Sequence, residues 1–301
     1  MTDHVFGSQS TDLKLQIIER YLREFTKALR PRFRELWYID AFAGTGTRTV
    51  KHDAIPADLW REEVAERIEQ RRGSATIALD VDPKFDRLFF IEKKKKHYDA
   101  LIALRGEHLT RRIDVLRGDA NEKILELINR RSWAGIRAVI FLDPYGMNLD
   151  WSTLEAIRDT RAIDVWYLVS LEGLFRQAAR DRAKLTDYKR AKICRMVGCA
   201  DWEDEWYPTS SGFDLVDIMS GSNAPSDGHR RMAGIGQMEA FFHRRLTSIF
   251  PKVAPPLRLK NKGGVETFSL FFAASNPEPK AYGLAMKIAT YILNAGRASQ
   301  T

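Results

Sequence analysis

Four acidic residues each follow a short apolar stretch of the kind that forms a buried strand, and carboxylates in such positions can bind a ligand. They are Asp40, Glu92, Asp119 and Asp143. In a parallel sheet the carboxyl ends of the strands meet at one edge, and ligands of open α/β sheets bind there. A single acid after a strand is most simply the cap of the following helix, but four in succession favour a shared binding site.

Each acid suits a different part of a nucleoside-like ligand. Glu92 can accept hydrogen bonds from both cis hydroxyls of a ribose, because a carboxylate has two acceptor oxygens. Asp119, between Gly118 and Ala120, can accept from an adenine amino group. Asp40 can accept from a cationic or hydroxylated group of the ligand.

The first acid opens a loop with the sequence Asp40-Ala41-Phe42-Ala43-Gly44-Thr45-Gly46. Its two glycines let the backbone pass close to a ligand, where a Cβ atom would collide. An ordinary tight turn between a strand and a helix would use the same residues, so the loop alone leaves both interpretations open. It is neither a dinucleotide fingerprint nor a P-loop, because G-x-G-x-x-G is absent and no Gly-Lys-Ser/Thr follows.

The elements that must position these acids alternate between strands and helices. This alternation predicts a mostly parallel sheet with right-handed crossovers. A C-terminal antiparallel hairpin is expected from residues 257–259 and 265–274, across a glycine turn. The hydrophobic patterns predict strands at 36–41, 87–92, 113–117, 138–142 and 163–169, and helices at 12–29 (with Asp12 as N-cap), 75–81, 94–105, 121–131, 150–159, 237–250 and 279–293.

The chain is predicted to be one domain over residues 1–301, with two additions to the basic pattern. Residues 48–72 have no strand signal and are predicted to be partly helical, over about 58–70, as an insertion and possible lid beside the first loop. This insertion accounts for the distance of 52 positions between Asp40 and Glu92, where about 20 is common. Residues 176–250 are predicted to form a basic helical insertion that binds the substrate.

The net charge of +8 is unevenly distributed along the chain. Residues 176–195 contain eight basic and two acidic side chains, and residues 230–262 contain eight basic side chains against Glu239 alone. The rest of the chain is therefore net acidic. A basic region of this kind suits a polyanionic partner such as nucleic acid, and we expect these two stretches to flank the substrate entrance.

Composition narrows the class of protein further. The 44% of hydrophobic residues can build a large core, and no apolar run reaches the length of about 18 residues that a membrane helix needs. The polar N-terminus lacks the apolar centre of a signal peptide. Two cysteines, Cys194 and Cys199, make neither a disulfide framework nor a four-ligand zinc site. A cytoplasmic protein without a bound metal is the expectation.

These motifs resemble those of class I S-adenosylmethionine-dependent methyltransferases. The loop at 40–46 is similar to the version found in amino-methyltransferases of nucleic acids. More specifically, the chain resembles the three-Cys-motif partner family over residues 12–180. The resemblance is carried by Lys14, Tyr21-Leu22, residues 39–46, Gly73-Ser74, Phe90-Ile91-Glu92, Gly118-Asp119-Ala120-Asn121 and residues 141–146, with Trp151 and Arg176 at later positions.

The resemblance implies a Rossmann-like methyltransferase fold with a mostly parallel seven-stranded sheet, and S-adenosylmethionine as cofactor. It also implies a partner protein, since the cysteines of the family name belong to a partner. The residues implied in binding the cofactor are Lys14, Asp40, Phe42, Ala43, Gly44, Gly46, Glu92, Asp119 and Ala120, and those implied in binding the substrate are Gly146 and Arg176.

The fourth acid opens the motif Asp143-Pro144-Tyr145-Gly146. The resemblance implies that Asp143, Pro144 and Tyr145 are the catalytic residues. Amino-methyltransferases of adenine have Asp/Asn-Pro-Pro-Tyr/Phe here, in which the acid or amide and a proline carbonyl accept hydrogen bonds from the target amine. Their aromatic ring stacks on a base that has been flipped out. In this chain Tyr145 takes the place of the second proline and Gly146 the place of the ring. A turn at the end of a strand would explain the same residues.

The leading hypothesis is methyl transfer from S-adenosylmethionine to an amino group of a DNA or RNA base. The alternative from another class is a catalytically silent protein that binds the cofactor and uses the fold for docking, because a fold does not fix a function. A third hypothesis is methylation of a protein or a small molecule.

Overall fold

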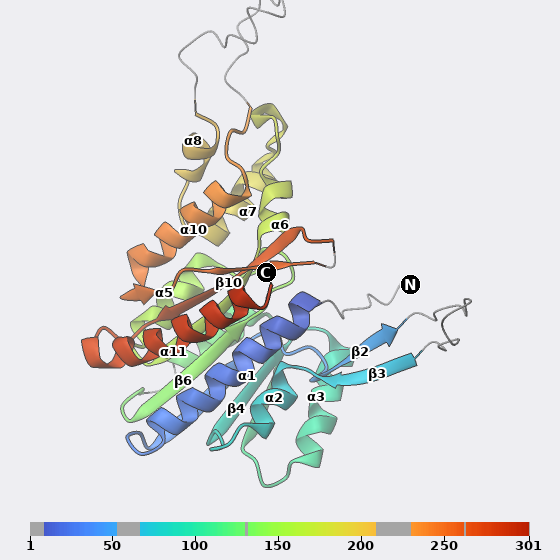
Figure 1. Cartoon of the computed structure of the whole chain (residues 1–301), viewed down its shortest axis with the longest axis vertical. Coiled ribbons are helices and arrows are strands. Elements are labelled where there is room, and N and C mark those ends of the chain that lie inside the picture. Colours follow the sequence, from blue (N-terminus) through green and yellow to red (C-terminus); the bar gives the residue numbers. More distant parts are fainter. Residues whose placement is uncertain (1–8, 53–66, 130–131, 209–229, 262, 301) are drawn as a thin grey trace, which may run out of the picture.

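The computed structural model describes residues 9–52, 67–129, 132–208, 230–261 and 263–300. Five parallel strands form the centre of the molecule (Figure 1). In spatial order they are β5 (Ile113–Arg117), β4 (Arg87–Glu92), β1 (Glu35–Asp40), β6 (Ile136–Leu142) and β7 (Ile163–Ser170).

Antiparallel strands complete the sheet beyond β7. The long strand β10 (Glu266–Ala274) pairs with β7 along seven residue pairs. Its other side pairs with β8 (Lys252–Val253) near its end and with β9 (Leu257–Lys260) near its start. The eight strands therefore occupy seven positions across the sheet. The predicted hairpin is confirmed, whereas the two-residue strand β8 was too short to be predicted from the sequence.

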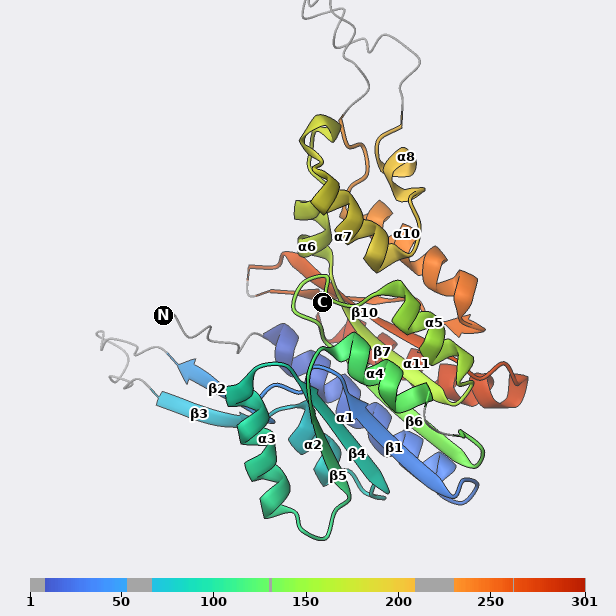
Figure 2. The same cartoon turned by 180° about the vertical axis from the view of Figure 1, so that it is seen from behind.

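Helices cover both faces of the sheet, as its near-continuous apolar strands require. On one face lie α1 (Gln9–Leu29), α2 (Ser74–Asp80), α3 (Lys95–Glu107) and α11 (Pro279–Ala298) (Figure 1). The other face carries α4 (Ala120–Asn129), α5 (Trp151–Asp159) and the helices of the basic region (Figure 2). This is the predicted Rossmann-like arrangement. Two helix boundaries differ clearly from the prediction. Helix α1 begins at Gln9, so that Asp12 lies inside its first turn rather than at its N-cap, and α11 continues to Ala298 rather than ending at residue 293.

The segment after the first loop differs from its prediction. Strands β2 (Thr47–His52) and β3 (Arg67–Arg72) form an antiparallel two-stranded ribbon. The predicted absence of strands at 48–72 is therefore wrong, and so is helix at 67–70, while 53–66 lie outside the described residues. Charged sequences such as RIEQRR lack the apolar alternation of a half-buried strand, so the ribbon gives no hydrophobic signal.

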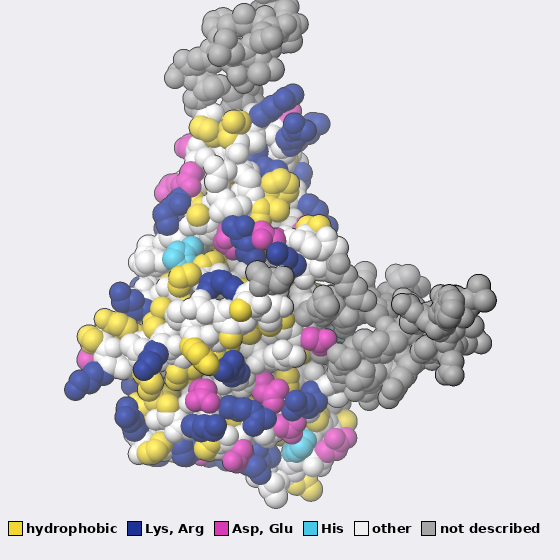
Figure 3. Space-filling view, viewed as in Figure 1, with side chains coloured by type: hydrophobic (Ala, Val, Ile, Leu, Met, Phe, Trp, Pro, Cys, Tyr) yellow, Lys and Arg dark blue, Asp and Glu magenta, His cyan; other side chains and the backbone are white. Residues whose placement is uncertain are grey.

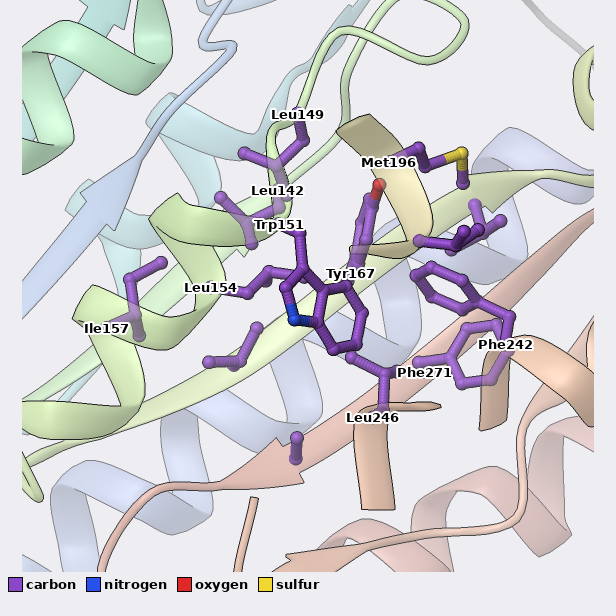
Figure 4. Close-up of a cluster of buried hydrophobic side chains, with 14 of the residues drawn as sticks. Leu142, Leu149, Trp151, Leu154, Ile157, Tyr167, Met196, Phe242, Leu246 and Phe271 are labelled. Carbon is purple, nitrogen blue, oxygen red and sulfur yellow. The ribbon is translucent and has the colours of Figure 1, made fainter. Parts of the chain in front are cut away.

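The basic region is helical, as expected, and projects from the sheet (Figures 1 and 2). It comprises α6 (Leu171–Gln177), the short 3-10 helix η1 (Arg182–Lys184), α7 (Asp187–Val197), α8 (Trp202–Trp206) and α10 (Ile235–Ile249). Its base is continuous with the main core, because Trp151 of α5, Tyr167 of β7 and Phe242 of α10 pack edge to face (Figure 4). The projection is thus anchored to the sheet.

Candidate functional site

The loop after β1 is built on two glycines in left-handed conformations. Gly46, at φ +79°, is packed tightly, because an added Cβ would lie 2.8 Å from the Leu104 side chain. Its carbonyl oxygen accepts hydrogen bonds from the Gly73 N–H at 2.8 Å and the Thr76 hydroxyl at 2.7 Å. Gly44, at φ +61°, has no atom within 4 Å of an added Cβ. Gly46 therefore fixes the loop, and Gly44 leaves its outer side open.

Asp40 lies beneath this loop and is fully buried. Its carboxylate accepts hydrogen bonds from the Tyr38 hydroxyl at 3.3 Å, the Phe42 N–H at 3.4 Å and the Ser74 side chain. The pKa of Asp40 is raised to about 7, mainly by burial. The hydrogen bonds oppose this rise, and the nearby charge of Asp143 adds to it. A cation bound close by would favour the ionised form.

Glu92, at the end of the neighbouring strand β4, holds the first loop in place. One carboxylate oxygen accepts from the Gly44 N–H at 3.1 Å, and the other accepts from the Lys94 N–H at 2.8 Å. His97 Nδ1 lies 3.6 Å from Glu92 Oε2. Each oxygen keeps a lone pair beyond these backbone contacts, so Glu92 can accept from a ligand as well.

Asp119, after β5, begins the third loop of the edge. One oxygen accepts from the backbone N–H and the side-chain amide of Asn121, at 3.0 and 3.2 Å, and the other lies 3.2 Å from the Lys93 ammonium. Partial burial opposes ionisation, but the hydrogen bonds from Lys93 and Asn121 hold the pKa of Asp119 below its usual value. Asp119 is therefore an ionised acceptor at the rim of the site.

Asp143, after β6, forms an ion pair with the first helix. The Lys14 ammonium lies 2.5 Å from Asp143 Oδ2 and 5.8 Å from the centre of the Phe141 ring. The Lys14 side chain is 11% exposed and that of Asp143 is 30% exposed. The carboxylate thus already binds a nitrogen donor while part of it remains open to solvent.

The turn after Asp143 presents an aromatic ring. Pro144 is buried, whereas Tyr145 is 49% exposed and has the Lys94 ammonium 4.6 Å from its ring centre. Burial of the hydroxyl, with the charges of Glu92 and Asp143, raises the pKa of Tyr145. Gly146, at φ +65°, has open space around an added Cβ. Tyr145, rather than the following position, therefore offers a ring next to the acids.

The other predicted site residues divide into two groups. Phe42 and Ala43 belong to the first loop, and Ala120 is the first residue of α4, directly after Asp119. Arg176, in contrast, is 71% exposed on α6 and contacts Glu172 at 3.4 Å. Within the described residues, Arg176 forms no hydrogen bond or ion pair with the four acids.

Four residues near the acids were not singled out from the sequence for a role there. Tyr38 and Ser74 bind Asp40, Lys94 contacts Glu92 and Tyr145, and His97 contacts Glu92. Tyr38 was detectable, because residues two apart on a strand share a face. The others face the site through loops and helix starts, which periodicity does not resolve.

The basic region uses much of its charge internally. Arg182 and Arg190 both bind Glu203, at 2.8 and 2.9 Å, while Arg258 binds Glu239 at 2.7 Å and Glu266 at 2.8 Å. Lys and Arg side chains nonetheless remain along the edge of the projection formed by α6 and η1 (Figure 3). The surface charge of this region is therefore smaller than the sequence count.

In the part of the chain that the structure describes, no group of three or more His, Cys, Asp or Glu side chains is arranged to hold a metal ion. Within the same ranges, no helix combines the length and apolar character needed to cross a bilayer.

No family model and no curated protein matches this chain. Among solved structures it is similar to a Legionella pneumophila protein described by the family model DUF519, with a TM-score of 0.45, 16% identity, and 94% of this chain and 93% of that chain covered. It is also similar to an O-methyltransferase from Bacillus cereus in complex with SAH, with a TM-score of 0.39, 12% identity, and 90% and 93% covered.

The class of fold follows from the strand order of the chain itself. Five parallel strands and, beyond them, the antiparallel pair of β10 and β9 were predicted from the sequence, and all are present. The protein has a Rossmann-like, methyltransferase-like fold.

Proposed function

We propose that this protein transfers the methyl group of S-adenosylmethionine to an amino group of a nucleic acid base. The observation that carries the proposal is the contact of Asp143 with a nitrogen donor, the Lys14 ammonium at 2.5 Å, at the edge where the other three acids lie. The carboxylate is held where it can accept a hydrogen bond from an amine. In the proposed enzyme, the target amine takes the place of Lys14.

The residues of the first three strand ends fit the cofactor. Gly44 leaves open space, Glu92 keeps acceptor capacity beside it, and Asp119 is ionised at the rim. Asp40 adds a second argument, since burial raises its pKa and a cationic sulfonium nearby would offset the cost of ionisation. When bound, the cofactor supplies a methyl group that is already activated for transfer.

The chain's own contribution is then mainly to orient the acceptor. Asp143 accepts a hydrogen bond from the amine and directs its lone pair, and the Pro144 carbonyl supplies a second acceptor, as in the motif that this sequence resembles. Tyr145 offers the half-exposed ring on which a base can stack. Holding two reactants in the productive geometry accounts for a large part of the rate of such a reaction.

Nucleic acid is the proposed substrate because of the basic region. It begins directly after β7, which pairs with β6, the strand that Asp143 follows. The basic region therefore leaves the sheet from the same edge. Exposed Lys and Arg side chains there would contact phosphates, and binding would then weaken steeply with salt.

The Lys14–Asp143 ion pair also favours a second candidate function, a cofactor-binding protein without catalytic activity. If Lys14 keeps Asp143 occupied, the acceptor position is closed and the fold serves for docking. The resemblance to three-Cys-motif partner proteins fits this candidate, because such a protein would act together with a partner.

Two experiments separate these functions. Calorimetry should detect binding of S-adenosylmethionine, weakened by Glu92→Ala and Asp40→Ala; no binding by the folded wild-type protein would exclude both cofactor functions. Transfer of a labelled methyl group is then measured with total DNA, RNA and protein as acceptors. Asp143→Asn, which keeps an acceptor oxygen, should retain transfer to nucleic acid, and Asp143→Ala should lose it. Cofactor binding without transfer to any acceptor would favour the silent protein, and label in protein alone would contradict the nucleic acid substrate.

A further inference from the structure

A cavity of about 350 Å³ lies at the opposite edge of the sheet from the four acids. It is enclosed by α1 and α11, which lie side by side on one face of the sheet (Figure 1), and by the starts of β6 and β7. Its size falls in the range of small-molecule sites, about 300 to 1,000 Å³. Most of its wall is apolar, with Phe25, Leu29, Phe33, Leu284 and Ile288 among the lining residues.

Two charged groups of opposite sign, both from strands of the sheet, line this cavity. Asp164 of β7 and Arg137 of β6 lie on the same face of the sheet, since Asp164 pairs with Val139, two residues after Arg137. Asp164 accepts a hydrogen bond from the Tyr21 hydroxyl at 2.7 Å. Arg137 donates to the Ile136 carbonyl at 2.8 Å and stacks on Phe33, 4.4 Å from its ring centre.

These two groups are close enough to interact electrostatically but do not pair directly. Each affects the pKa of the other, yet they form no ion pair within 4.0 Å with each other or with another residue of the described ranges. Burial nevertheless raises the pKa of Asp164 to about 6. Both residues are only partly exposed. Charges that are partly removed from water without a close partner carry a cost, and here the space beside both of them is the cavity.

The charged side chains that line the cavity indicate which class of ligand it can bind. A pure cation would meet three basic side chains, Arg137 and the exposed Arg32 and Lys280 at the mouth. A pure anion would meet Asp164 and the exposed Glu278 at the mouth. A molecule with both charges satisfies both groups, and the apolar walls then take an apolar side chain. We propose that this cavity binds a free α-amino acid with an apolar or aromatic side chain, its ammonium on Asp164 and its carboxylate on Arg137.

The test is calorimetry of the full chain near pH 7.5 with four separate probes. L-phenylalanine and L-leucine carry both charges, while 2-phenylethylamine lacks the carboxylate and 3-phenylpropionate lacks the ammonium. We expect at least one amino acid to bind with a Kd of about 1 mM or below, and each single-charge analogue to bind at least about tenfold more weakly. Binding of neither amino acid, or equal binding of an analogue, would overturn the proposal.

Variants locate the binding. Asp164→Asn, which can still accept from Tyr21, and Arg137→Met should each weaken amino acid binding about tenfold or more, and Ala281→Trp should fill the cavity and abolish it. Lys287→Met, an exposed position on α11 outside the cavity, is the control. Circular dichroism and melting temperature establish that each variant is folded. Unchanged affinity in folded Ala281→Trp would mean that the amino acid binds elsewhere, contrary to the proposal.

Discussion

The Lys14 ammonium and the Asp143 carboxylate, 129 positions apart in the sequence, form an ion pair of 2.5 Å. Lys14 comes from the first helix and Asp143 from the end of β6, so the contact joins the N-terminal helix to the edge that carries the four acids. The ammonium also compensates the negative charge of Asp143. The nearby Asp40 already has a raised pKa, and the charge of Asp143 contributes to that rise.

This ion pair should contribute measurably to stability. Lys14→Met leaves the partly buried Asp143 without its cation, and we expect the free energy of unfolding to fall by about 1–3 kcal/mol, between the values for exposed and buried pairs. Urea denaturation measures this change. Lys14→Met combined with Asp143→Asn should recover most of the loss, because no uncompensated charge remains.

The matched control is Lys27→Met, on the same helix. Lys27 pairs with Glu24 at 3.6 Å, but this pair is far more exposed. The Lys27 side chain is 58% exposed and the Glu24 side chain is 50% exposed. Exposed pairs of this kind contribute about 0–1 kcal/mol. If Lys14→Met and Lys27→Met have equal effects, Lys14 does not compensate a charge at the site.

Asp40 should make the protein less stable as the pH rises from about 4 to about 7. Its pKa is raised by burial from 3.8 to about 7, so the folded state holds a proton that the unfolded chain releases over this interval. Stability linked to this group is therefore present at low pH and is lost as the pH approaches 7. Asp164, whose pKa is raised by burial to about 6, acts in the same direction.

Asp40→Asn isolates this effect from the other titrating groups. The difference in unfolding free energy between the variant and the wild type should shift in favour of the variant by a few kcal/mol between pH 4 and pH 7, since one pKa unit corresponds to about 1.4 kcal/mol. Denaturation at several pH values measures it. A difference that stays constant with pH would show that Asp40 titrates normally.

Much of the fold can be predicted from the sequence, because the central strands are buried on both faces and are therefore continuously apolar. The apolar run of β4 was predicted with its observed bounds, Arg87–Glu92, and those of β5 and β6 agree to within two residues. The four strand-end acids follow from the same strands, since a parallel sheet brings their carboxyl ends to one edge. Contacts between these loops, such as the Gly44 N–H to Glu92, bear out that arrangement.

Other features depend on interactions that one sequence does not reveal. The ribbon of β2 and β3 is held by backbone pairing between charged segments, so no hydrophobic period marks it. Lys14 was expected near a cofactor, but its partner Asp143 lies too far along the chain for local spacing to indicate the pairing. Acidic side chains also bind Arg182, Arg190 and Arg258. The positive charge on the surface is therefore smaller than the number of basic residues in the sequence suggests.

The two open glycines of the site make a matched pair of variants. Gly44→Ala and Gly146→Ala both force a Cβ onto a left-handed backbone, φ +61° and +65°, without any clash. Each should therefore cost about 1–2 kcal/mol of stability. Only Gly44→Ala should also weaken binding of S-adenosylmethionine, measured by calorimetry, because the proposed cofactor passes that glycine. Equal loss of binding in both variants would point to a general effect of backbone strain.

The exposed charges of the basic region should govern binding to nucleic acid. Arg180, Lys184 and Arg230 are exposed, and the bridge between Asp181 and Arg230 brings their segments together. Unlike Arg182 and Arg190, they form no ion pair with an acid among the described residues. Reversing them should therefore change the surface charge and leave the ion pairs of Glu203 intact.

The triple variant R180E/K184E/R230E should bind DNA or RNA more weakly than the wild type while S-adenosylmethionine binds equally well. The slope of log affinity against log salt should fall by up to about 2–3, because each lost phosphate contact removes about 0.9 from it. Fluorescence anisotropy at several salt concentrations gives both quantities. The control K27E/K84E/K287E makes the same change of net charge at exposed lysines away from the basic region. An equal loss of affinity in this control would mean that net charge alone attracts the nucleic acid, and that the projection beside Asp143 has no special part in binding it.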